Sequence, residues 1–144
     1  METVVVFLVE DNPADVLLVR VALSQIPFPL KLLVAKDGEQ ALKMLNSPDF
    51  QPQLIILDLN MPRVDGQTVL QQYQQTKIPI VIFSSTQNKT EVQKALALGA
   101  REYVQKPIGF EPYADAVRGI VNRWILPPQL PAAAGETTRN SPLG

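Results

Sequence analysis

Short apolar runs recur along the chain, and stretches with helical spacing separate them. Three of these runs, residues 4–9, 54–57 and 78–83, are apolar throughout. Uninterrupted, often β-branched runs of this length are typical of strands buried on both faces of a parallel sheet. Weaker strand signals lie at residues 30–35 and 102–105, so the pattern predicts five strands.

The stretches between the strands predict helices, and capping residues mark their ends. Asn12 followed by Pro13 indicates the start of the first helix, which Pro27 and Pro29 end. Gly99 stops the fourth helix, because glycine readily adopts the left-handed conformation that follows many helices. The second predicted helix follows Asp37, and the third begins at Asp65 or Gly66. The fourth covers about residues 89–98, and the fifth runs through Tyr113 to Trp124.

Strict alternation of strand and helix predicts an α/β fold. Short alternating segments favour a five-stranded parallel sheet with right-handed crossovers and helices on both faces. We expect the strand order 2-1-3-4-5, the flavodoxin-like doubly wound arrangement. Residues 1–126 are predicted to form this one domain. Residues 127–144 hold four prolines and three consecutive alanines with little apolar periodicity, so we expect a flexible tail there.

The amino-acid composition excludes several kinds of partner and active site. Thirteen basic and 14 acidic residues give a net charge of −1, so no strong field attracts nucleic acid or an anionic membrane. Histidine and cysteine are both absent, which excludes serine-histidine catalysis, thiolate nucleophiles and most transition-metal sites. The start of the chain lacks the pattern of a signal peptide, and no apolar stretch approaches the length of a membrane helix. We therefore expect a soluble, cytoplasmic protein.

Polar side chains follow four of the predicted strands, at the edge of the sheet where doubly wound proteins collect their active groups. Glu10 and Asp11 follow the first strand, Asp58 follows the third, Ser84, Ser85 and Thr86 follow the fourth, and Lys106 follows the fifth. Three converging carboxylates repel one another unless a cation offsets their charge, and oxygen ligands without histidine or cysteine favour Mg²⁺. A carboxylate facing Mg²⁺, a lysine and a hydroxyl is suited to receive a phosphoryl group.

Several segments carry a further signal: residues 7–12, 56–62 with Asp65 and Gly66, 99–100 and 103–107. They resemble the signature segments of the receiver domains of two-component response regulators, the group that includes the chemotaxis regulators. They occur in the family's order and spacing, and the resemblance covers residues 4 to about 125. The stretch Glu10–Asp15 is similar to single-domain receivers paired with sensor kinases, including phytochrome-associated ones.

The resemblance implies roles at the predicted pocket. Asp58 resembles the phosphoacceptor, and Lys106 resembles the lysine that binds the phosphoryl group. Glu10 and Asp11 correspond to the acidic pocket. Together with Asp58 and the backbone carbonyl of Asn60, they would hold Mg²⁺.

Further positions resemble the family's switch. Ser84 falls on its Ser/Thr position and Tyr103 on its aromatic position, so these two are expected to couple the site to the surface. Asn60 and Thr86 would flank the path of the water that hydrolyses the aspartyl phosphate. The resemblance also implies a cis peptide bond between Lys106 and Pro107.

The resemblance implies a signalling switch and not an enzyme, with only slow self-catalysed phosphorylation and dephosphorylation. A sensor histidine kinase is the expected partner. The output would be changed protein contacts on the face of the fourth helix, fifth strand and fifth helix, with homodimer formation as one form of it. We expect no direct nucleic-acid or membrane partner, and the residues do not identify the downstream target.

Rival interpretations exist for the same residues. Taken alone, Asp11 suits a helix cap, and Lys106 suits a solvated surface position. An aspartate-nucleophile phosphohydrolase would carry a second aspartate two residues after Asp58, where this chain has Asn60. A flavodoxin-like cofactor carrier would need a phosphate loop after the first strand, where Glu10 and Asp11 would repel the phosphate. A fold kept only for docking is disfavoured, because every expected chemical residue is present.

Overall fold

Five parallel strands form one sheet in the order β2-β1-β3-β4-β5, as the alternating pattern predicts. The computed structural model describes residues 3–61 and 63–125, so the predicted tail at 127–144 lies outside the described residues. The strands are β1 (Val4–Val9), β2 (Leu30–Ala35), β3 (Leu54–Leu57), β4 (Ile80–Ser84) and β5 (Glu102–Gln105).

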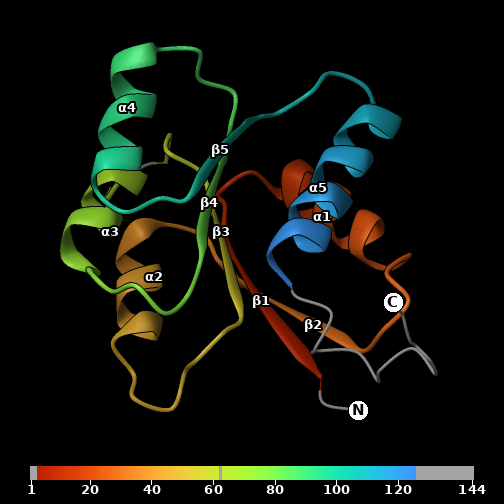
Figure 1. Ribbon diagram of the computed structural model, residues 1–144, viewed down its shortest axis with the longest axis horizontal. Helices are drawn as coiled ribbons and strands as arrows, with labels where there is room; N and C mark the ends of the chain where they lie inside the picture. Colours follow the sequence, from red (N-terminus) through yellow and green to blue (C-terminus); the bar gives the residue numbers. More distant parts are fainter. Residues whose placement is uncertain (1–2, 62, 126–144) are drawn as a thin grey trace, which may run out of the picture.

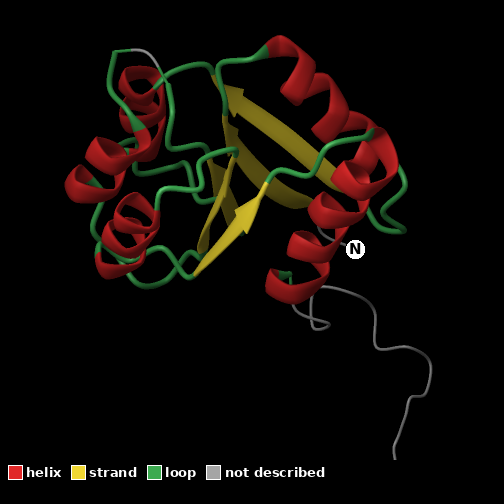
Figure 2. Cartoon of the chain, turned by 90° about the horizontal axis from the view of Figure 1, so that it is seen from above, coloured by secondary structure: helices red, strands yellow, loops and turns green. Residues whose placement is uncertain are grey.

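Helices cover both faces of the sheet. Figure 1 shows α2, α3 and α4 on one face and α1 and α5 on the other, and Figure 2 shows the twisted sheet between these two layers. The helices are α1 (Pro13–Leu23), α2 (Gly38–Leu45), α3 (Gly66–Gln72), α4 (Lys89–Ala97) and α5 (Phe110–Trp124). Among the described residues, none of these helices is long and apolar enough to cross a membrane.

The interior strand β1 is apolar at every position because both of its faces are covered. Val6 and Leu8 pack into the core under α1 and α5, whereas Phe7 and Val9 pack into the core on the opposite face. All four side chains are at most 2% exposed. Successive side chains of a strand point to opposite faces, so a strand covered on both sides must be apolar at every position.

Local chemistry explains where the elements begin and end. The side chain of Asn12 caps α1 by accepting from the Ala14 backbone N–H at 2.9 Å. Gly99 ends the turn after α4 at a φ of 116°, where residues with a Cβ are strained. The strand expected from residue 78 begins at Ile80 instead. Both backbone groups of Ile78 bond to the Gln75 side chain, at 2.7 and 3.0 Å, which keeps Ile78 out of the sheet.

Candidate functional site

Two acidic side chains leave the carboxyl ends of neighbouring strands. The backbone N–H of Glu10 donates to Ala35 at 3.0 Å and that of Asp58 to Val9 at 3.1 Å, which extends the hydrogen bonding of the sheet to both residues. Glu10 is 3% exposed and Asp58 is 6% exposed, whereas Asp11 is open to solvent. One carboxylate oxygen from each of the three residues lies within 4.8 Å of the others. The sheet therefore brings the predicted acidic residues together.

Lys106 reaches these carboxylates from the end of β5. Its Nζ lies 2.7 Å from Glu10 Oε1 and 3.2 Å from Asp58 Oδ2, and its side chain is 8% exposed. Burial by itself would lower the pKa of Lys106. The hydrogen bond to Glu10 and the charges of the surrounding carboxylates outweigh burial, so the pKa is raised and the ammonium stays charged.

The second oxygen of Asp58 is held by different donors. Asp58 Oδ1 accepts from the Ser84 hydroxyl at 2.8 Å and from the Asn60 backbone N–H at 3.1 Å. Ser84 is fully buried, so its hydroxyl depends on these neighbours for hydrogen bonds. Gly66 packs against this loop so closely that a Cβ would lie 2.5 Å from the Asp58 carbonyl oxygen. The loop thus requires a residue without a side chain at position 66.

The two remaining predicted residues, Tyr103 and Thr86, lie beside Ser84. The Tyr103 hydroxyl donates to the carbonyl of Thr86 and lies 3.5 Å from that of Ser84. The Thr86 hydroxyl accepts from the Asn88 backbone N–H at 3.2 Å, at the start of α4. The structure thus links Tyr103 to the β4–α4 loop by hydrogen bonds.

One expectation at the site is wrong. The structure has no cis peptide bond among its described residues, so the bond between Lys106 and Pro107 is trans. In this geometry the Lys106 backbone N–H donates to the Ser84 carbonyl at 2.9 Å. The lysine still reaches Glu10 and Asp58.

The acidic cluster suits a hard divalent cation. Its three side chains offer only oxygen ligands, and the chain contains no histidine or cysteine. Burial raises the pKa of Glu10 to about 7, and the charge of Asp58 adds to this rise, while Lys106 opposes it. A cation beside these oxygens would favour the ionised carboxylates.

Sequence reasoning missed a fourth carboxylate at the site, that of Asp15. Its Oδ2 lies 3.4 Å from Lys106 Nζ, and its Oδ1 accepts from the Tyr113 hydroxyl at 2.7 Å. The available signal was the position of Asp15 in the first turn of the helix that follows the acidic pair Glu10 and Asp11.

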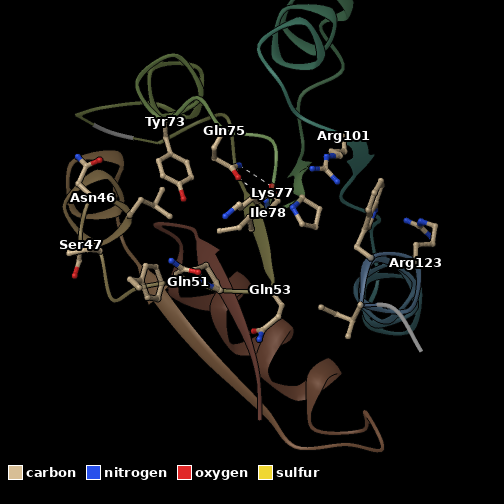
Figure 3. Close-up of a pocket in the computed structure, with 17 residues that line it drawn as sticks. Asn46, Ser47, Gln51, Gln53, Tyr73, Gln75, Lys77, Ile78, Arg101 and Arg123 are labelled. Carbon is tan, nitrogen blue, oxygen red and sulfur yellow. Dashed lines mark hydrogen bonds between the residues drawn. The ribbon is translucent and has the colours of Figure 1, made fainter. Parts of the chain in front are cut away.

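A large cavity lies away from these residues. It has a volume of about 800 Å³ and lies where the loops enter β3 and β4, beside the end of α5 (Figure 3). Its walls include Tyr73, Gln75 and Arg101, and none of the predicted site residues lines it. Volume alone therefore does not locate the cluster of coupled charges.

A comparison with protein-family models decides the family. Residues 6–118 match the response regulator receiver domain. The chain belongs to this family. Receiver domains of this family bind a divalent metal ion and have a histidine kinase as phosphodonor. Membership in the family does not favour the interpretation as a phosphohydrolase.

Similar proteins include regulators linked to phytochromes. The chain is 34% identical over 140 residues to response regulator Rcp1 of Synechocystis sp., covering 90% of this chain and 94% of that protein. The phosphorylated cyanobacterial phytochrome response regulator RcpA has a similar structure, with a TM-score of 0.81 and 31% identity over 86% of this chain and 95% of that one. The Mn²⁺-bound form of Rcp1 gives a TM-score of 0.78 at 31% identity, over 89% of this chain and 99% of that one.

Proposed function

We propose that Asp58 accepts a phosphoryl group from a phosphohistidine of a sensor histidine kinase, in a Mg²⁺-dependent reaction. The observation that carries this proposal is the arrangement around the Asp58 carboxylate. One oxygen faces the Lys106 ammonium and the other accepts from the Ser84 hydroxyl, while two more acidic side chains stand beside them. A buried carboxylate costs folding energy, and here it is placed where cationic and hydroxyl groups can meet an incoming anion.

The chemistry is a transfer between two nucleophiles. An oxygen of Asp58 forms a bond to phosphorus as the bond from phosphorus to the kinase imidazole nitrogen breaks. The electron pair of that bond stays on the imidazole, and solvent can supply its proton. The Lys106 ammonium would offset the charge of the phosphoryl oxygens, and the Ser84 hydroxyl would donate to one of them.

Mg²⁺ is the proposed metal, held by Glu10, Asp11, Asp58 and the backbone carbonyl of Asn60. When bound, it supplies positive charge opposite the phosphoryl oxygens. The all-oxygen donor set supports a hard cation of this kind. The Mn²⁺-bound form of the relative Rcp1 supports a divalent ion, and we infer Mg²⁺ from the ligand chemistry.

The kinase would approach over the β5–α5 loop, which follows Lys106. In this loop Ile108 is 97% exposed, and Phe110, the first residue of α5, is 43% exposed. Large apolar side chains exposed next to a reactive group are typical of surfaces that a partner covers. Because such kinases use ATP, we place this exchange in the cytoplasm.

The output would be a change of protein contacts on the face formed by α4, β5 and α5. A phosphoryl group on Asp58 would draw the Ser84 hydroxyl from the carboxylate toward a phosphoryl oxygen. Tyr103, which bonds to the loop after Ser84, would then change its position. Few contacts distinguish the two states, so the signal would be a population shift, with homodimer formation as one form of it.

Phosphorylation can be tested with Mg²⁺ and a small phosphodonor, followed by intact mass measurement. We expect one added phosphoryl group in the wild-type chain and none in Asp58→Asn. Asp49→Asn is the matched control, because Asp49 is exposed and lies outside the acidic cluster. Labelling that persists in Asp58→Asn would mean that the acceptor is wrongly assigned.

A further inference from the structure

Lys106 has an acidic neighbour that the proposed phosphoryl transfer does not use. Asp15 lies in the first turn of α1, and its Oδ2 is 3.4 Å from Lys106 Nζ. Its other oxygen accepts from the hydroxyl of Tyr113 on α5, at 2.7 Å. Two helices thus contribute to the surroundings of one lysine.

Tyr113 fixes the position of the Asp15 carboxylate. Tyr113 is 4% exposed, and its ring packs edge-on against Phe83 with centroids 5.1 Å apart. Burial raises the pKa of Tyr113, and the charge of Asp15 raises it further, so the hydroxyl keeps its proton and remains a donor. A rigid donor at 2.7 Å orients the acceptor, so Asp15 is directed by its bond to α5.

Three carboxylates surround the ammonium of Lys106. It donates hydrogen bonds to Glu10 at 2.7 Å and to Asp58 at 3.2 Å, and it makes an ion pair with Asp15 at 3.4 Å. A phosphoryl oxygen that binds Lys106 therefore competes with these carboxylates for the charge of the ammonium. Asp15 makes the longest contact, and its side chain, 18% exposed, is the most accessible of the three. The contact with Asp15 is the least costly one to break.

We infer that Asp15, oriented by Tyr113, is a positioning residue that holds Lys106 before phosphorylation and competes with the phosphoryl group for its ammonium. Asp15 then lowers the affinity of the site for a phosphoryl group. It also links the position of Lys106 to the packing of α1 against α5. This inference rests on the proposed function, because it assumes that an anion binds at Asp58.

The test measures the affinity for beryllofluoride, a phosphoryl mimic, in the presence of Mg²⁺. Asn at position 15 keeps an acceptor for the Tyr113 hydroxyl but removes the charge, so Asp15→Asn should fold normally. We expect it to bind beryllofluoride about three- to tenfold more tightly, since one partly buried competing charge is removed. Asp115→Asn makes the same change of net charge at an α5 residue whose side chain is 71% exposed, and it should bind as the wild type does.

A double-mutant cycle with Lys106→Met separates positioning from a general field effect. Positioning through the lysine predicts that Asp15→Asn has no effect in the Lys106→Met background. Tyr113→Phe should raise the affinity by a smaller factor than Asp15→Asn, and it should add nothing once Asp15 is Asn. Non-additivity of this pair is a readout that loss of packing alone would not produce.

Three results would contradict the inference. The first is an unchanged or weaker affinity in Asp15→Asn, and the second is an equal gain in the Lys106→Met background. Full additivity of the Asp15 and Tyr113 changes is the third. A wild-type chain that binds no beryllofluoride would instead refute the proposed function, so the two failures can be told apart.

Discussion

The two ends of the sheet differ in how their polar side chains are connected. At the carboxyl end, Glu10, Asp15 and Asp58 all contact one ammonium, that of Lys106. At the opposite end lies the cavity of about 800 Å³, where two of the lining glutamines make separate local bonds. The Gln53 side chain accepts from the Val5 backbone N–H at 2.7 Å, and the Gln75 side chain bonds to the backbone of Ile78.

This difference predicts how substitutions should combine at each end. Groups in one network influence each other, so their effects on free energy do not add, whereas effects at separated bonds do. The small acidic pocket should therefore behave as one unit. Gln53 and Gln75 at the large cavity should behave as independent contacts, because no hydrogen bond joins them among the described residues.

The largest expected effect is the loss of signal transmission in Ser84→Ala. Asp58 should still accept a phosphoryl group, but residue 84 would have no hydroxyl to donate to a phosphoryl oxygen. In the wild type, amide exchange should change with phosphodonor at residues 84–90 and 99–110, and in Ser84→Ala these changes should disappear. Removing the hydroxyl also leaves Asp58 Oδ1 with one donor fewer, so we expect a loss of about 1–3 kcal/mol in the free energy of unfolding.

Ser84→Thr provides the matched control, because it retains the hydroxyl and should preserve the exchange changes. If Ser84→Ala transmitted the signal undiminished, the switch would not depend on this hydroxyl. Changes in amide exchange that are confined to the Asp58 loop would also contradict the proposed switch.

A large but partial effect is expected for metal binding in Asp11→Ala. Asp11 is exposed and contributes an oxygen to the acidic cluster, so its loss should weaken Mg²⁺ binding by about tenfold or more. Titration with Mg²⁺ measures the affinity. Tyr73→Phe, at the far cavity, should bind Mg²⁺ as the wild type does. Equal affinities of the two variants would remove Asp11 from the site.

The fold and the centre of the site follow from the sequence for physical reasons. Strands buried on both faces, such as β1, need apolar residues throughout, which makes them recognisable. Parallel strands bring their carboxyl ends to one edge, so Glu10, Asp58 and Lys106 could be predicted to meet. Family resemblance supplied the specific roles, and those of the individual residues stay predictions.

Other features could not be read from the sequence. The contact between Asp15 and Tyr113 joins residues 98 positions apart, and it depends on how α1 packs against α5. Strand β4 begins two residues later than predicted, because the Gln75 side chain forms hydrogen bonds with both backbone groups of Ile78. Such side-chain bonds depend on tertiary packing and leave no periodic signal.

A smaller effect is expected at the opposite end of the sheet in Gln53→Ala. The change removes the acceptor of the Val5 N–H, so the free energy of unfolding should fall by about 1 kcal/mol. Denaturant unfolding measures this loss. Phosphorylation and Mg²⁺ affinity should stay unchanged, because Gln53 precedes β3 at the end of the sheet opposite to the acidic residues. A changed Mg²⁺ affinity would show that the two ends of the sheet are coupled after all.

The smallest expected effect concerns the lifetime of the aspartyl phosphate in Thr86→Ala. The Thr86 hydroxyl accepts from the Asn88 N–H, so it is tied to the start of α4 and contributes no base for hydrolysis. Alanine leaves more room for water beside the site, and we expect hydrolysis to accelerate by a few-fold, corresponding to a barrier lower by about 1 kcal/mol. Thr86→Ser keeps the hydroxyl and should differ less. Phosphorylated protein freed of donor and followed by intact mass gives the rate, and phosphorylation itself should be retained in both variants. A lifetime that responds neither to Thr86→Ala nor to a change of the Asn60 side chain would place the path of the attacking water elsewhere.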